Sequence, residues 1–139
     1  MIDSIYRIFE ALGYPHPLHP PATHIPMGML LGGFFFSLLR LKRGEFSATA
    51  YHCLVLSLIF LPVTAATGFM DWQHRLYGRM NGLILAKIIM TACLLSLLAA
   101  AAYKKQKGTL SERAMTAVWI SALLLAMGLG YVGGELAYG

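Results

Sequence analysis

Charge is scarce in this chain of 139 residues: Asp, Glu, Lys and Arg make up 12% of it, against 58% hydrophobic residues. A soluble domain of this length carries about twice that charged fraction, which argues against a soluble fold. Several predominantly apolar runs are at least 17 residues long. Runs of this length are typical of helices that span a bilayer, so the composition predicts a polytopic membrane protein.

Cysteine is also scarce, since Cys53 and Cys93 are the only two and both lie within apolar runs. We therefore expect no disulfide framework, and the C-x-x-C-H signature of covalent haem is absent. Walker motifs, dinucleotide fingerprints and Ser/His/Asp arrangements are missing too, which argues against a soluble-type hydrolase or transferase. The net charge of +5 is scattered over helix ends. We therefore expect a lipid bilayer as partner and no nucleic acid.

The first 24 residues predict two short segments that precede the bundle. Apolar residues recur every three or four positions in residues 1–13, with Gly13 as a stop, which predicts an amphipathic helix in the membrane interface. Residues 14–24 contain four prolines and three histidines. We expect this stretch to be an extended connector, because prolines at that density do not suit a helix interior.

Residues 25–139 predict a four-helix bundle within a single membrane domain, 1–139. The spans are expected at about 25–41, 48–70, 82–103 and 113–131. At a rise of about 1.5 Å per residue they are long enough to cross the hydrocarbon core. Pro26 suits the first position of the first of these helices. The connectors are short, so the predicted fold is all-α with an up-down-up-down order.

Basic residues are distributed unevenly between the two sides of this bundle. The first and third connectors hold seven of them, and the opposite side holds only Arg7, Arg75 and Arg79. The positive-inside rule then places the first and third connectors in the cytoplasm. We therefore expect a multi-pass protein of the bacterial inner membrane with both termini in the periplasm.

Polar side chains gather at the predicted periplasmic side. Four of the five histidines lie there, namely His16, His19, His24 and His74. Further polar or aromatic residues join them: Asp71, Trp72, Arg75, Arg79, Asn81, Lys87 and Glu135. This concentration at one end is the main functional signal of the sequence.

Several short motifs follow one another in a fixed order. They are His19-Pro20 and His24-Ile-Pro26, then Thr67-Gly68-x-x-Asp71-Trp72, then Asn81, and finally Gly-Tyr-x-Gly-Gly-Glu-Leu-x-Tyr over 130–138. Together they resemble the bacterial predicted membrane protein family called domain of unknown function 2231, over nearly the whole chain. The resemblance implies a four-helix membrane domain that is sometimes fused to Rieske iron–sulfur or cytochrome c modules. Such fusions suggest redox partners of those two kinds.

A b-type haem at the periplasmic end is the first hypothesis for these residues. Haem in membrane proteins takes neutral imidazoles from facing helices, and His24 and His74 are the first-choice metal ligands. His19 is the substitute ligand, and Trp72 would pack on the ring edge. The propionates would be neutralised by Arg75, Arg79 or Lys87. Each histidine alone also suits an ordinary interfacial residue that bonds to backbone or lipid.

A quinol pocket is the second hypothesis. A quinol needs a proton acceptor and hydrogen-bond partners beside an apolar slot. Asp71, with His24 or His74, would supply the catalytic proton acceptor, and Asn81 a polar clamp. The alternative for Asp71 is a carboxylate at a helix end that pairs with Arg75 or Lys87.

A structural or assembly subunit without turnover is the third hypothesis. Its polar end would lock the helix ends together. A rarer variant would hold Cu(I) on imidazole and thioether ligands, with the set His24, Met27, Met70 and Met80. We expect a small redox subunit that passes electrons between quinol or haem and a periplasmic partner. The sequence leaves its oligomeric state and its turnover as an enzyme open.

Overall fold

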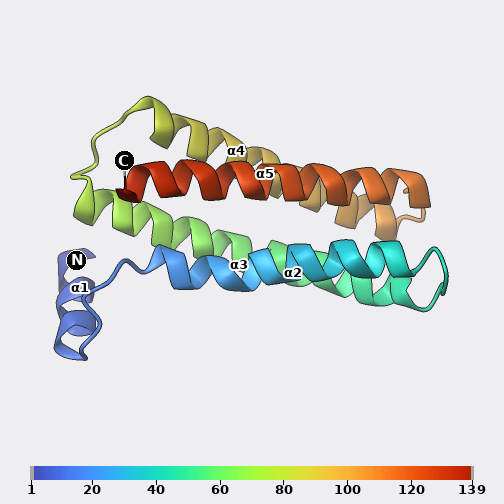
Figure 1. The fold of residues 1–139 in the computed structure, drawn as a ribbon, viewed down its shortest axis with the longest axis horizontal. Helices are drawn as coiled ribbons and strands as arrows, with labels where there is room; N and C mark the ends of the chain where they lie inside the picture. The colour runs from blue at the N-terminus through green and yellow to red at the C-terminus, as the bar shows by residue number, and fades with distance from the viewer. Residues whose placement is uncertain (1, 139) are drawn as a thin grey trace.

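Five helices make up the computed structural model, which describes residues 2–138. They are α1 (Ile2–Ala11), α2 (His19–Leu39), α3 (Phe46–Arg75), α4 (Gly82–Gln106) and α5 (Glu112–Tyr138). The four long helices run alternately up and down, and both chain ends lie at the same end of the bundle as the α3–α4 connection (Figure 1). The predicted all-α fold with four spanning helices and a short N-terminal helix is confirmed.

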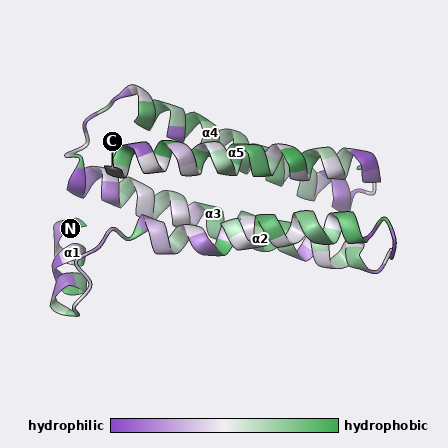
Figure 2. Cartoon of the chain, in the orientation of Figure 1, coloured by the Kyte–Doolittle hydropathy of each residue, from purple (hydrophilic) through white to green (hydrophobic). Residues whose placement is uncertain are grey.

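The outer surface of the bundle is apolar. In each long helix only 17–28% of the most apolar 18-residue window is buried inside the chain. Large side chains such as Phe35, Leu124 and Met127 are 55–68% exposed. Hydrophilic residues gather toward the two ends of the bundle instead (Figure 2). This distribution suits a protein whose sides contact lipid and whose ends contact water.

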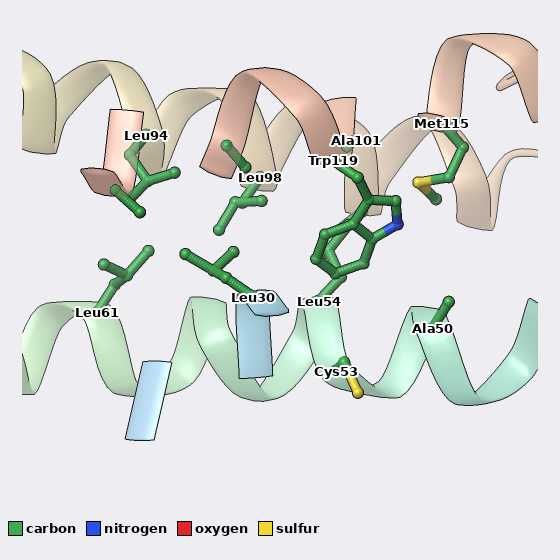
Figure 3. Close-up of a cluster of buried hydrophobic side chains, with 13 residues drawn as sticks. Leu30, Ala50, Cys53, Leu54, Leu61, Leu94, Leu98, Ala101, Met115 and Trp119 are labelled. Atoms are coloured by element: carbon green, nitrogen blue, oxygen red, sulfur yellow. The ribbon is translucent and has the colours of Figure 1, made fainter. Parts of the chain in front are cut away.

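Close packing at a small residue joins α5 to α2. Trp119 of α5 is 0% exposed, and its indole reaches toward α2 and α3 among leucines from several helices (Figure 3). The ring lies against Gly33 of α2, where an added Cβ would stand only 2.6 Å from Trp119 Cζ2. Small residues of this kind let helices approach in a membrane, where no hydrophobic force drives them together.

The start of α2 differs from the prediction. We expected an extended connector over residues 14–24, but α2 begins at His19, with Pro20 in its first turn. First-turn N–H groups have no acceptor within the helix, so proline costs nothing there. Pro26 lies inside α2 and not at its first position, and its missing N–H frees the Ala22 carbonyl. The Thr64 hydroxyl of α3 donates to that carbonyl at 3.1 Å.

At the opposite end, a buried guanidinium ties α2 to α5. Arg40 is only 8% exposed and pairs with the carboxylate of Glu112. Arg40 also donates to the Ser37 carbonyl at 2.9 Å and to the Thr116 hydroxyl at 3.0 Å. Burial lowers the pKa of Arg40. This cluster closes the end of the bundle that we expect to face the cytoplasm.

Candidate functional site

Asp71, near the end of α3, caps α2 from outside. Its two carboxylate oxygens accept hydrogen bonds from the backbone N–H groups of Leu18 at 3.0 Å and His19 at 2.9 Å. The N-cap of α2 is Leu18, which has no capping side chain of its own. A carboxylate is the preferred partner for the free N–H groups and the positive dipole of a helix start. The Tyr6 hydroxyl of α1 donates to the same carboxylate.

His19 has a defined tautomer because its ring is held from one side. Nδ1 lies 2.9 Å from the carbonyl oxygen of Thr64, and a carbonyl can only accept, so Nδ1 carries the proton. Nε2 is then unprotonated, and it accepts a hydrogen bond from Nζ of Lys87 at 3.4 Å. The ring passes close to Gly68 of α3, where an added Cβ would stand 2.9 Å from Nδ1. The glycine in the Thr67-Gly68 motif therefore makes room for the imidazole.

Lys87 brings a positive charge into α4 without a carboxylate beside it. Among the described residues no Asp or Glu oxygen lies within 4.0 Å of its Nζ, and His19 Nε2 is its hydrogen-bond partner. The ammonium lies near Gly133 of α5, where a Cβ would be 3.6 Å away. Charges inside membrane helices are costly and mark functional positions.

A cavity of about 260 Å³ opens beside this pair. It lies between the four long helices, and His19 and Lys87 are the only titratable side chains among the lining residues. Most of its wall is apolar and comes from Pro20, Pro26, Met27, Leu30, Leu61, Ala65, Leu94, Ala126 and Leu129. Binding sites for small molecules combine such walls with a few convergent polar groups. The pocket is therefore suited to an apolar ring or chain that carries one polar end.

The two histidines that we named as haem ligands lie elsewhere. His24 is exposed on α2, with Nδ1 at 2.7 Å from the Pro20 carbonyl. His74 stacks on Tyr6 with ring centroids 3.9 Å apart, and its Nδ1 lies 2.8 Å from an Asp3 oxygen. Neither residue lines the cavity. Their role as haem ligands stays a prediction from the sequence.

Most of the remaining residues of the predicted site shape the α3–α4 turn. The indole N–H of Trp72 donates to the Arg79 carbonyl at 2.9 Å, and the Asn81 side chain caps α4 by accepting from the Ile84 N–H at 2.8 Å. Arg75 donates to the Pro15 carbonyl at 3.2 Å, where it joins α3 to the connector after α1. No carboxylate pairs with Arg75 or Arg79 within 4.0 Å in the described part of the chain.

Residues 2–138 contain no cluster of side chains suited to bind a metal ion. No three His, Cys, Asp or Glu side chains there are grouped closely enough to hold one ion.

Tyr6 and Thr64 contribute to the site, and the sequence analysis did not single them out. Tyr6 shows only as one ring on an amphipathic helix, and Thr64 reads as an ordinary residue of an apolar span.

A comparison with protein families identifies the chain. The family described as a predicted membrane protein, DUF2231, matches residues 15–139. The chain belongs to the DUF2231 family. The match covers α2–α5, whereas α1 precedes it. Neither a search of curated proteins nor one of solved structures returned a match for this DUF2231 protein.

Proposed function

We propose that this DUF2231 protein is a small membrane redox subunit that binds a quinol in the cavity beside His19 and Lys87. The observation that carries the proposal is the pairing of a ring acceptor with an ammonium donor, 3.4 Å apart, on the wall of an apolar cavity inside a membrane bundle. A quinol is an apolar ring with hydroxyl groups that must lose their protons when it is oxidised. The pocket offers a complementary group for each of these features.

His19 is the proton acceptor in this proposal. Its Nε2 is unprotonated in the tautomer fixed by the Thr64 carbonyl, and it would take a proton from a quinol hydroxyl that replaces Lys87 as its hydrogen-bond partner. Lys87 would stabilise the phenolate that forms, and it would donate to the carbonyl oxygen of the quinone product. Oxidation of one quinol releases two protons and two electrons. The protons would leave by way of His19, and the electrons would pass to a cytochrome c or Rieske-type partner.

This assignment moves the proton acceptor away from Asp71. The Asp71 carboxylate already accepts hydrogen bonds from two backbone N–H groups and from Tyr6. It also does not line the cavity, so a quinol bound there would not have this carboxylate on its wall. His19, which the sequence offered only as a substitute ligand, lines the cavity instead, and its unprotonated Nε2 lies 3.4 Å from Nζ of Lys87.

The route into the pocket supports a ligand that arrives from the lipid. Met27 is 40% exposed although it lines the cavity, and the lining residues Pro20 and Gly130 are exposed as well. These residues belong to the apolar sides of α2 and α5, which face lipid in a membrane. A quinol is dissolved in the bilayer and would enter through this side without crossing water.

Binding of a short-chain ubiquinone to the purified protein in lipid nanodiscs tests the proposal. We expect saturable binding, weakened about tenfold or more in Lys87→Met, because the donor to the carbonyl oxygen is lost. Lys107→Met, an exposed lysine at the other end of the bundle, is the matched control and keeps the wild-type affinity. Absence of saturable binding to the wild-type protein would refute the proposal and favour a subunit without turnover.

A further inference from the structure

Helix α1 touches the bundle through one deeply buried side chain. The helix lies beside the start of α2 and the end of α3, and its axis runs crosswise to theirs (Figure 1). Tyr6 is only 3% exposed, whereas Ile8 and Leu12 of the same helix are 60% and 77% exposed. Tyr6 is therefore the anchor of α1.

The anchor binds directly to α3. The Tyr6 hydroxyl donates to Asp71, and its ring stacks on the imidazole of His74 with an interplanar angle of 4°. Asp3, one turn earlier in α1, pairs with Nδ1 of the same imidazole at 2.8 Å. Burial and the bond to Asp71 raise the pKa of Tyr6, so the hydroxyl keeps its proton and remains a donor.

The same carboxylate that receives Tyr6 holds the backbone of His19. Asp71 binds the N–H of His19 at 2.9 Å, and the imidazole on that residue reaches the Thr64 carbonyl and Lys87. Two hydrogen bonds to one carboxylate thus connect the anchor of α1 to the backbone of His19, the residue whose imidazole lines the cavity. If α1 undocks and Tyr6 moves away, Asp71 loses a hydrogen-bond donor that fixes its rotamer. The carboxylate then holds the backbone N–H groups at the start of α2 less firmly.

The geometry points to α1 as a positioning element for the cavity: Tyr6 on Asp71 holds His19 with Nε2 toward Lys87, and undocking of α1 lowers the affinity for quinol. Tyr6 and Asp71 are positioning residues here, since neither lines the cavity. The quinol part of this inference rests on the proposed function. The positioning of the imidazole does not depend on it.

Tyr6→Phe removes the hydroxyl and keeps the ring that stacks on His74. We expect changed ring-nitrogen NMR signals for His19 in protein labelled with ¹⁵N-histidine and assigned with His19→Gln. We also expect quinone affinity to fall by about tenfold, the lower end of the loss seen when the support behind a metal ligand is removed. Tyr14→Phe is the matched control, because the Tyr14 hydroxyl bonds to the Pro17 carbonyl at 3.3 Å and not to Asp71. That variant keeps both wild-type values.

A second variant guards against misfolding of the first. Asp3→Asn weakens the docking of α1 at His74 without touching Asp71, and we expect changes in the same direction and of smaller size. Wild-type His19 signals in both Tyr6→Phe and Asp3→Asn would overturn the positioning role, even when the wild-type protein binds quinone. Changed signals together with no quinone binding by the wild type would support positioning and refute the proposed function.

Discussion

Gly68→Ala places one methyl group against the imidazole on which the proposed site depends. The added Cβ would lie 2.9 Å from Nδ1 and 3.1 Å from Cε1 of His19, well inside normal contact distance. Both Gly68 and the start of α2 belong to helix backbone, so the ring must move and lose its bond to the Thr64 carbonyl. Overpacking costs about 1–3 kcal/mol and the lost hydrogen bond about 1 kcal/mol, so we expect about 2–4 kcal/mol less stability.

Gly28→Ala supplies the control for this change. Gly28 also lies inside a spanning helix, and an added Cβ there meets no atom within 4 Å. We expect its stability to be unchanged or slightly higher, since alanine is the better helix former. The assay is unfolding in detergent, followed with quinone affinity on the same samples. Equal stability and equal affinity of Gly68→Ala and Gly28→Ala would refute the placement of His19 against α3.

Three other predictions concern the helix contacts and α1. Gly33→Ala forces a methyl group into the indole that crosses it, and we expect a loss of about 3 kcal/mol in the same unfolding assay. Glu112→Gln leaves the buried Arg40 without its carboxylate. We expect stability to fall by only about 1–2 kcal/mol, because the Glu112 side chain is 58% exposed. Glu45→Gln, at the exposed pair with Arg43, is the control and changes stability by nothing measurable. Burial and the bond to Asp71 raise the pKa of Tyr6 above 10.0. The neutral hydroxyl therefore stabilises the docking of α1 fully below pH 10, and less as the pH rises beyond it. Phenolate absorbance between pH 10 and 11 should be the same in wild type and Tyr6→Phe.

The topology could be predicted because long apolar runs and short connectors leave few alternatives. The same reasoning placed the polar residues at one end, and the structure brings His19, Asp71 and Lys87 together there. Helix boundaries were less certain because proline is neutral in a first turn and disruptive only further in. The predicted connector over residues 14–24 is therefore too long, because α2 begins at His19.

The choice between His19 and His24 could not be made without the start of α2. Five positions along an α-helix rotate a side chain by about 140°, so only one of the two can face the bundle interior. The structure turns His19 inward and leaves His24 exposed. The roles of Asp71 and Tyr6 depend on contacts between residues 65 positions apart, which no local pattern in the sequence reveals.

Photolabelling with a quinone that carries a photoreactive group, followed by peptide mapping, tests quinol binding in the cavity most directly. We expect the label on cavity residues such as Met27 or Leu61, with displacement by excess unlabelled quinone and loss of labelling in Lys87→Met. Label spread only over lipid-facing residues such as Phe35 and Leu124, and unaffected by excess quinone, would contradict a quinol site beside His19 and Lys87.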